Sequence, residues 1–334
     1  MKNITIQDIA DEASVSKATV SRVLNNTSAV RPDKREAILE AIERLGFKPN
    51  VVARSLARGR SMTIGVVTQN IGSPFYDTIA QGVIAGLGET GYSPIFADGQ
   101  WQRGTEVEAI QALIGRRVDG LVLIGGDIPA EQLEGLCGDL PTVVVARQLP
   151  ADHHHCIFTD NVEGGYRVTR HLIEKGHREI AIVLGIEHHP DAIDRLEGYK
   201  RALAEAGIEF DPSLVLPGDF TAESGVVAID ELSGRGRVFT AVFAANDTTA
   251  FGVRLALYRR GLRVPEDVSI TGFDDQAEAA FMAPPLTTIR QPGREMGVQA
   301  SRSLLELIEG KPFESRPLQG ELIERESVGS PPAG

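Results

Sequence analysis

The chain has 334 residues, of which 42% are hydrophobic, 24% are charged and only 5% are aromatic. This composition fits a globular α/β protein of two or three domains, and no apolar run is long enough to cross a membrane. Two cysteines are too few for a disulfide framework, and the N-terminus lacks the apolar core of a signal peptide. We therefore expect a cytoplasmic protein with two ordinary thiols.

The charge is distributed unevenly along the chain. Residues 1–60 contain 11 Lys and Arg against 7 Asp and Glu, a net charge of +4, whereas the remaining residues carry −16. A basic module attracts phosphates, and an acidic body is repelled by them. The split indicates nucleic-acid binding by the N-terminal segment, although such a split alone is weak evidence.

The N-terminal segment predicts three helices and no strand. Thr5 caps the first helix, and Asp8 three residues later makes an acidic variant of the capping box. A turn follows at Ser14. The third helix begins near Pro32, a favourable first-turn residue, and ends at Gly46.

The second helix spans 17–25 and is capped by Ser16. Opposite its apolar stripe, one face carries Lys17, Ala18, Ser21, Arg22 and Asn25 at helical spacing. An arginine can bond guanine through two hydrogen bonds, a lysine can reach a base or a phosphate, and serine and asparagine can bond phosphates. The pattern favours a DNA recognition helix. On periodicity alone, a solvated face of a small interaction domain remains an alternative.

Residues 49–60 form a linker too short to persist as an isolated helix. From Met62 onward, apolar strands alternate with amphipathic helices, which predicts parallel sheets covered by helices on both faces. We expect strands at 62–68, 93–97, 118–124, 142–146, 156–159, 179–184, 213–216, 239–243, 268–273 and 286–289. The expected helices include 74–89, 162–175, 192–206, 248–260 and 294–308. So many strands predict two doubly wound lobes, with a ligand cleft at the carboxyl ends of their strands.

Ordered motifs along the whole chain resemble the LacI/GalR family of transcription regulators. They include TIQDIADEASVSKATVSRVLNN, AIERLGFKPNVVARSLARGRS, HLIEKGHREIAIV, DRLEGYKRAL, FAANDTTAFGVRLAL, VPEDVSITGFDD and PLTTIRQP. The resemblance implies a helix-turn-helix DNA-binding domain over 1–48, a hinge helix over 49–60 and an effector-binding domain over 61–330. This last domain resembles periplasmic ribose-binding proteins. Its N-lobe is expected at about 61–160 and 292–320, and its C-lobe at about 161–291 and 321–330.

The same resemblance implies a homodimer on a pseudo-palindromic, double-stranded operator. Leu56 of the hinge helix would wedge between central base pairs in the minor groove, and the small Ala53 would let two hinge helices approach. The complete expected DNA-binding set is Thr5, Ser16, Lys17, Ala18, Thr19, Ser21, Arg22, Asn25, Ala53 and Leu56. Many family members have glycine where this chain has Ser14, and serine is costlier there if the turn requires a positive φ.

Comparison with ribose-binding proteins carries over an effector site through the local motifs SPFY, ARQ, DRLEGY, GDF, FAAND, GFDD and TIRQ. The matching residues are Ser73, Phe75, Tyr76, Arg147, Arg195, Phe220, Asn246, Asp274 and Gln291. Aromatic rings would stack on a sugar, and Asp and Arg side chains would bond its hydroxyls. Sugar binders often have aspartate at the position of Ala146, so one hydroxyl contact is missing here or is supplied by Asp127 or Asp191.

Several of these residues also have ordinary structural explanations. Asp274 and Asp275 could cap a following helix, and Phe75 could belong to the core. The run 153–155 is three histidines, which cannot easily converge on one ion, so we expect a solvated loop and no metal site. His188 and His189 lie near the expected cleft mouth, where a role in specificity is open.

The resemblance implies allosteric repression, with a small sugar, a monosaccharide or a related sugar, bound between the lobes and acting more often as inducer than as corepressor. A purine or nucleoside effector, or a protein corepressor, remains an alternative. A secreted sugar-binding transport protein is a remote one. We expect neither an enzyme nor a cofactor, because the sequence has no P-loop, no GxSxG motif and no metal-ligand cluster.

Overall fold

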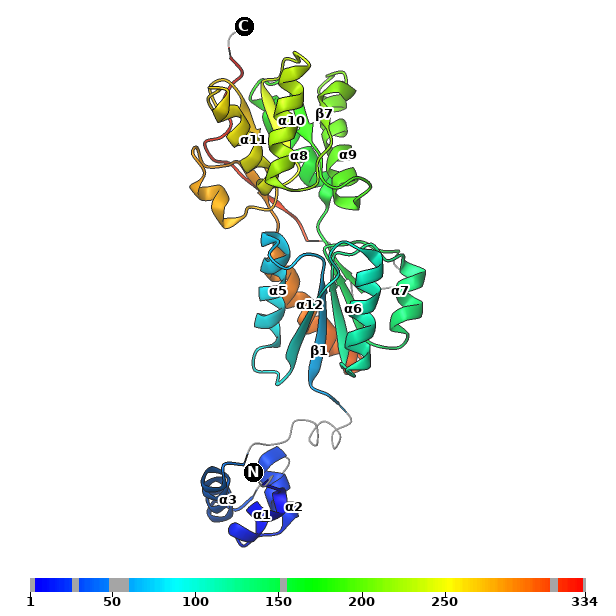
Figure 1. Ribbon diagram of the computed structural model, residues 1–334, viewed down its shortest axis with the longest axis vertical. Coiled ribbons are helices and arrows are strands. Elements are labelled where there is room, and N and C mark those ends of the chain that lie inside the picture. Colours follow the sequence, from blue (N-terminus) through cyan, green and yellow to red (C-terminus); the bar gives the residue numbers. More distant parts are fainter. Residues whose placement is uncertain (1–3, 26–29, 48–59, 151–154, 313–317, 333–334) are drawn as a thin grey trace. The chain divides into compact units, whose positions relative to one another are not determined.

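The computed structural model describes residues 4–25, 30–47, 60–150, 155–312 and 318–332. The chain divides into two compact units, Met1–Ser61 (unit 1) and Met62–Gly334 (unit 2). Figure 1 labels their helices and strands in chain order. None of the helices in these ranges is both long and apolar enough to span a membrane.

Unit 1 contains the three predicted helices, α1 (Ile6–Glu12), α2 (Lys17–Asn25) and α3 (Pro32–Leu45). Each contributes a pair of buried apolar residues to one small core. The predicted capping box is present, because the Asp8 carboxylate accepts the Thr5 backbone N–H at 2.7 Å while the Thr5 side chain accepts from the Asp8 N–H. The third helix ends, as predicted, at Gly46 in the left-handed conformation.

The turn between α1 and α2 places Ser14 at φ 50°. The sequence analysis made the cost of a serine here conditional on a positive φ, and that condition is met. A residue with a Cβ is strained in this conformation by roughly 1–2 kcal/mol. The turn that orients α2 is therefore strained at one position.

Unit 2 is built on two parallel sheets, as predicted. The first has the strand order β2-β1-β3-β4-β5, and the second has the order β7-β6-β8-β9. The strands of the first sheet are β1 (Thr63–Thr68), β2 (Ser93–Asp98), β3 (Gly120–Ile124), β4 (Thr142–Val145) and β5 (His155–Ile157). Those of the second are β6 (Ile180–Val183), β7 (Val215–Leu216), β8 (Ala241–Ala244) and β9 (Ser269–Thr271).

A third, antiparallel pair consists of β10 (Thr288–Arg290) and β11 (Glu321–Ile323). The sequence analysis did not predict β11, which has only three residues, none of them fully buried. Such a short segment has no visible period, so nothing in the sequence distinguishes it from a loop.

Helices cover both faces of each parallel sheet. On the first sheet, α5 and α12 share one apolar cluster, and α6 and α7 share the cluster on the other face. On the second sheet, the corresponding pairs are α10 with α11 and α8 with α9. The helices are α5 (Pro74–Leu87), α6 (Arg103–Gly115), α7 (Ala130–Cys137), α8 (Asn161–Glu174), α9 (Pro190–Glu205), α10 (Ala222–Gly234), α11 (Asp247–Arg259) and α12 (Gly293–Ile308), with short 3-10 turns η1 (Pro212–Leu214) and η2 (Ala277–Phe281).

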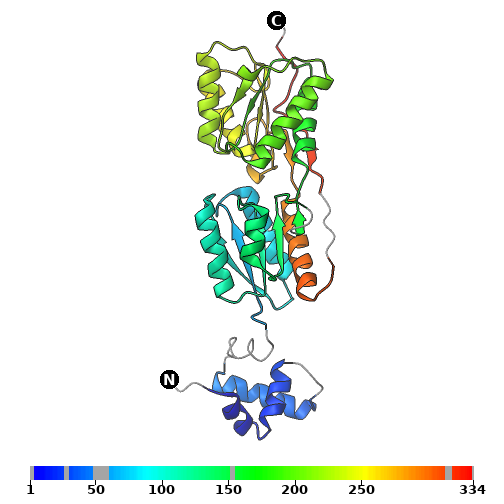
Figure 2. The ribbon, with the colours of Figure 1, turned by 90° about the vertical axis from the view of Figure 1, so that its right-hand side faces the viewer.

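The first sheet with α5, α6, α7 and α12 is called the N-lobe below, and the second sheet with α8 to α11 is called the C-lobe. The chain passes between the lobes three times: from β5 to α8, from β10 to α12, and from α12 to β11. Both ribbon views show α12 lying with the N-lobe although it follows the whole C-lobe in sequence (Figures 1 and 2).

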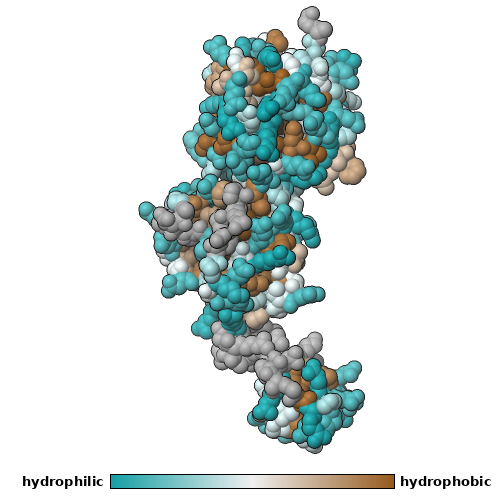
Figure 3. Space-filling model, turned by 180° about the vertical axis from the view of Figure 1, so that it is seen from behind, coloured by the Kyte–Doolittle hydropathy of each residue, from teal (hydrophilic) through white to brown (hydrophobic). Residues whose placement is uncertain are grey.

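Two glycines allow α12 to approach α5 closely. A Cβ on Gly82 would lie 2.2 Å from the Arg294 carbonyl oxygen, and one on Gly297 would lie 2.0 Å from that of Ile79. Any side chain at either position would force the helices apart. The face of unit 2 seen in Figure 3 is hydrophilic over most of its area, with hydrophobic residues in limited areas, as expected when the apolar helix faces point toward the sheets.

We expect Ser14→Gly to stabilise unit 1 by about 0.5 kcal/mol, because relief of the left-handed strain exceeds the added chain entropy of the unfolded state. The measurement is amide hydrogen exchange in the helices of unit 1 within the full chain. Gly46→Ser is the matched reverse change at φ 64° and should destabilise the same helices. Equal protection in both variants would show that neither turn is strained.

Candidate functional site

The exposed face of α2 carries most of the predicted DNA-reading residues. Lys17, Ala18 and Arg22 are exposed, while Val20 and Val23 on the opposite face are buried. A shallow depression beside this face is lined by Thr5, Ile6, Gln7, Lys17, Ala18 and Ser21, which joins the start of α1 to the start of α2. Asn25 is the last residue of α2.

Three of the predicted DNA-binding residues take part in helix capping. The Thr5 hydroxyl lies 2.6 Å from the Asp8 carboxylate. Ser16 Oγ accepts the Thr19 backbone N–H at 3.2 Å, and the two hydroxyls of this pair lie 2.8 Å apart. These contacts fix the first turns of α1 and α2, where helix N–H groups are available to an anion. Ala53 and Leu56 lie outside the described residues.

Unit 2 holds a cavity of about 480 Å³ between its lobes. Eight of the ten predicted effector-binding residues line it: Ser73, Phe75, Tyr76, Asp191, Arg195, Phe220, Asn246 and Asp274. They come from the loops that follow β1, β7, β8 and β9 and from the beginnings of α5 and α9, the helices that follow β1 and β6. The cavity therefore lies at the carboxyl ends of parallel strands, where the strand–helix alternation predicted a cleft.

Arg195 is the centre of the polar wall of this cavity and is 3% exposed. Its Nε donates to Asn161 Oδ1 at 2.9 Å and its Nη1 to the Ala245 carbonyl at 2.5 Å. The guanidinium stacks on the Phe273 ring, with 3.8 Å from Cζ to the ring centroid. A buried cation of this kind is stable only when it is hydrogen-bonded and has counter-charges nearby.

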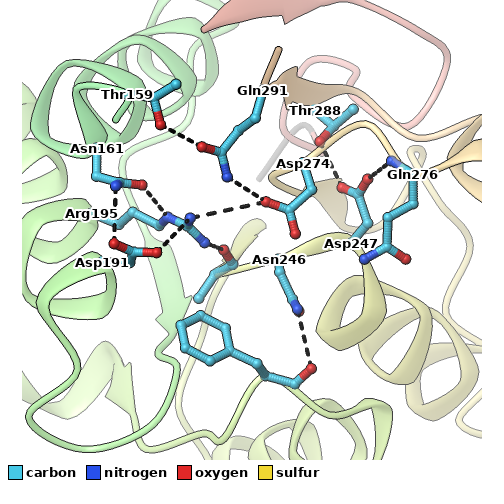
Figure 4. Close-up of polar contacts among 12 residues, drawn as sticks. Thr159, Asn161, Asp191, Arg195, Asn246, Asp247, Asp274, Gln276, Thr288 and Gln291 are labelled. Carbon is cyan, nitrogen blue, oxygen red and sulfur yellow. Dashed lines mark hydrogen bonds and ion pairs between the residues drawn. The ribbon is translucent and has the colours of Figure 1, made fainter. Parts of the chain in front are cut away.

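Two carboxylates supply those counter-charges. Arg195 Nη2 lies 3.8 Å from Asp191 Oδ2 and 3.9 Å from Asp274 Oδ1, and Figure 4 shows the guanidinium between them. Both separations are longer than a hydrogen bond, so each carboxylate retains capacity to accept from a ligand hydroxyl. Of the two aspartates expected to compensate for Ala146, Asp191 lines the cavity, whereas Asp127 pairs with Arg103 at 2.9 Å.

Asp274 is a strained and perturbed residue. Its φ is 109°, a region unfavourable for any residue with a side chain, and burial raises the pKa of its carboxyl to about 6 despite the attraction of Arg195. The neighbouring Asp247, which is fully buried, accepts from Thr288 Oγ1 at 2.6 Å and from the Gln276 N–H at 2.7 Å, and burial also raises its pKa. Such a pair of aspartates is typical of a ligand site.

Two predicted residues, Gln291 and Arg147, are not among the residues that line this cavity. Gln291 instead holds Asp274, because its Nε2 donates to Asp274 Oδ1 at 2.8 Å while its Oε1 accepts from Thr159 at 2.5 Å. Arg147 lies in the N-lobe beside the acidic side chains of Glu106 and Asp127, and burial lowers the pKa of its guanidinium.

Other assignments are refined by the hydrogen bonds. Asn246 lines the cavity, but its side chain caps α11 through the Thr249 N–H at 2.8 Å and donates to the Phe220 carbonyl at 3.1 Å. Neither Asp274 nor Asp275 caps the following 3-10 turn; Asp275 pairs with Arg290 at 2.7 Å and with Arg325 at 2.6 Å. Phe75 both packs against the core and lines the cavity.

A series of ring contacts forms the aromatic wall of the cavity. It runs from Phe75 to Tyr76, Trp101, His189 and Phe220, with centroid separations of 5.6, 5.7, 4.8 and 5.5 Å. The first three rings belong to the N-lobe and the last two to the C-lobe, so this wall crosses the cleft. His189 caps α9 through its Nδ1, and burial lowers its pKa, which keeps the ring neutral.

The sequence analysis missed several residues of the cavity. They include Asn70, Trp101, Ile186, Asp219, Thr221, Glu223, Thr248 and Gln276. Most of them follow a predicted strand. A search of the residues after every predicted strand would therefore have found Trp101, which follows the strand predicted at 93–97. His155 starts β5, while 153–154 lie outside the described residues. Over the described ranges, no group of three His, Cys, Asp or Glu side chains is arranged to hold a metal.

We expect Asp274→Asn to stabilise unit 2 above pH 6 by about 2 kcal/mol. A carboxyl with a raised pKa binds its proton more tightly in the folded state, so folding is penalised as the pH rises from 4 to 6 and the penalty is complete above 6. Asparagine mimics the neutral acid and removes the penalty. Thermal unfolding at pH 4.5 and 8 should therefore show a gain mainly at pH 8.

The neighbouring Asp275→Asn is the control for that experiment. It breaks two ion pairs with Arg290 and Arg325, so it should lower the unfolding temperature at pH 8. A pH-independent effect of Asp274→Asn, or a loss of stability at pH 8, would contradict the assignment of a buried, strained carboxylate.

Comparison with known proteins gives matches over nearly the whole chain. Residues 5–50 match the family model for bacterial regulatory proteins of the lacI family, and residues 169–328 match a periplasmic binding protein-like domain. The chain is 39% identical to the transcriptional regulator CelR of Thermobifida fusca, covering 97% of this chain and 98% of CelR. It is 37% identical to the transcriptional regulator GalR of Escherichia coli (strain K12), covering 98% and 96%.

Solved structures agree with this assignment. A lac repressor dimer bound to operator and the anti-inducer ONPF superposes with a TM-score of 0.90 at 28% identity, covering 98% of this chain and 100% of that one. A CelR–cellobiose complex gives a TM-score of 0.73 at 37% identity, covering 97% and 99%. CelR and GalR, each more than 30% identical over almost its full length, show that the chain belongs to the LacI family of bacterial transcription regulators.

Proposed function

We propose that the chain is a transcriptional repressor that binds a pseudo-palindromic operator as a homodimer and releases it when a small neutral sugar enters the cavity of unit 2. The observation that carries this proposal is the cavity itself, where a buried polar wall around Arg195 faces a wall of aromatic rings. Ligand pockets for sugars combine flat apolar surfaces with a few fixed polar groups, and this cavity has both.

The charges around the cavity favour a neutral ligand. Four carboxylates line it, those of Asp191, Asp219, Glu223 and Asp274, against the single cation Arg195. That cation already donates to Asn161 and to a backbone carbonyl. A phosphate or carboxylate ligand would meet net repulsion, whereas sugar hydroxyls can donate to the carboxylates in charge-assisted hydrogen bonds. The cellobiose complex of CelR supports a neutral sugar effector.

The proposed DNA contacts follow the face of α2. Arg22 and Lys17 are exposed on it, so they can reach base edges and phosphates in the major groove. Leu56 is proposed to unstack the central base pairs from the minor groove, and the small Ala53 is proposed to let two hinge helices approach. The operator-bound lac repressor dimer supports both the operator and the homodimer, and operator binding implies action in the cytoplasm, where the chromosome of a bacterium lies.

Coupling between the two sites is proposed to act through the lobes. A ligand that touches both walls changes the preferred angle between N-lobe and C-lobe, because only three chain passages join them. The proposed sugar is bound without turnover and should be recovered chemically unchanged.

The first test combines ligand binding with operator release. With operator sites selected from random DNA by the protein itself, an inducing sugar should raise the operator Kd by about 5–150-fold, and operator should raise the sugar Kd by the same factor. Thermal unfolding against neutral sugars, sugar phosphates and nucleosides identifies the ligand, with Asp274→Ala as the site variant. A shift with nucleosides alone, or one unchanged in Asp274→Ala, would overturn the sugar cavity.

A second test concerns α2. Arg22→Ala should weaken binding to the selected operator about 10–100-fold while affecting non-specific DNA much less, because a base-specific contact is lost. Arg44→Ala is the charge-matched control. Arg44 lies on α3, outside the proposed reading face of α2, and its guanidinium pairs with Glu12 at 2.9 Å. It should lower both affinities slightly and equally. Equal effects of the two variants would contradict the role of Arg22.

A further inference from the structure

The cavity is larger than one sugar ring requires. A single pyranose occupies less than half of about 480 Å³. The polar side chains also form two sets. An inner set of Asp191, Arg195 and Asp274 is largely buried, whereas the outer Asn70, Asp219 and Glu223 are exposed. One ring bound to the inner set leaves the outer set and much of the volume for a second ring.

Trp101 is the residue whose position the fold does not explain. It follows β2, and both Gln100 and Trp101 have left-handed backbones, with φ of 55° and 54°. Two consecutive non-glycine residues in this region are both strained. The side chain is half-buried and packs against the N-lobe core, and its remaining surface lines the cavity, so burial in the core accounts for only part of that strain.

The strained loop is nevertheless held firmly. Asp98 Oδ1 accepts the Gln100 N–H at 2.9 Å, and Asp98 Oδ2 accepts the Ile71 N–H at 3.0 Å. One carboxylate thus ties the Trp101 loop to the loop that follows β1, and both loops line the cavity. Strain that is maintained by dedicated hydrogen bonds at the edge of a ligand cavity indicates a functional position.

The indole has room to stack on a ligand. Its two ring neighbours meet it at interplanar angles of 48° for Tyr76 and 76° for His189, so neither lies parallel to it. Aromatic faces are the surfaces on which the C–H faces of sugars pack. For the sugar ring bound to the inner set, the platform is Phe220, whose ring centroid lies 5.8 Å from Arg195 Cζ. Trp101 offers a second platform in the other lobe.

We propose that Trp101 is a specificity-determining residue that selects an effector with two sugar rings, a neutral disaccharide, over a free monosaccharide. The inner ring bonds Asp191, Arg195 and Asp274, and the second ring packs on Trp101. The proposal rests on the proposed sugar effector and narrows its class. It also departs from the monosaccharide expected from the sequence.

The test uses the full chain, in which Trp101 is the sole tryptophan, so its fluorescence reports on the cavity. Cellobiose, lactose and maltose are titrated beside glucose, galactose and ribose, and calorimetry repeats each titration for the variants. At least one disaccharide should bind ten-fold or more tightly than any monosaccharide and change the Trp101 emission. Trp101→Ala should weaken disaccharide binding ten-fold or more and abolish that preference, and Trp101→Phe should restore most of it.

The outcomes separate this proposal from the proposed function. The sugar cavity stands if sugars bind and Asp274→Ala abolishes their binding. In that case the role of Trp101 is wrong if monosaccharides bind as tightly as disaccharides, or if Trp101→Ala keeps the preference for disaccharides. If no sugar binds, or binding survives Asp274→Ala, the sugar effector is wrong and the role of Trp101 falls with it.

Discussion

The burial of one guanidinium, that of Arg195, constrains the whole ligand-binding unit. Its partners come from the start of α8, the first turn of α9, the end of β8 and the loop after β9. Asn161 and Ala245 accept its hydrogen bonds, and Asp191 and Asp274 offset its charge, as a buried guanidinium requires. The carboxyl ends of three strands are thereby held in register around a single charge, and the cavity takes its shape from that arrangement.

The cavity is also where the backbone departs most from relaxed geometry. Trp101, Phe220 and Asp274 all have positive φ, and each presents its side chain from a strand-end loop. Regular elements elsewhere compensate for this strain: continuous apolar strands and close helix packing leave the lobes little freedom to relax it. This separation of strained loops from relaxed strands and helices suits a protein that responds to a ligand, because the strained positions line the cavity.

The regular parts of the molecule could be predicted from the sequence. Periodicity identified α2 and its exposed face, capping residues located the ends of α1 and α3, and continuous apolar runs identified the parallel strands. Eight cavity residues were identified through the motifs shared with ribose-binding proteins and the departure at Ala146, and they lie after those strands. The rest depends on contacts between distant segments. Gln291 and Arg147 could not be separated from true lining residues, because their partners Thr159 and Glu106 lie elsewhere in the chain. The backbone conformation at Trp101 has no signal in a window of local sequence either.

The return of α12 to the first lobe has a consequence for biosynthesis. The last strand of the N-lobe sheet ends at Ile157, and α12 begins only at Gly293, 136 positions later. Until it is made, one apolar face of the nascent sheet is covered by α5 alone, and the part that Met296, Ala300 and Leu304 finally cover stays open on the ribosome. At ordinary synthesis rates this interval lasts roughly 10–30 s, ample time for chaperone capture or aggregation. The C-lobe helices and its parallel sheet are complete before that point, so the middle of the chain matures first and the N-lobe closes last.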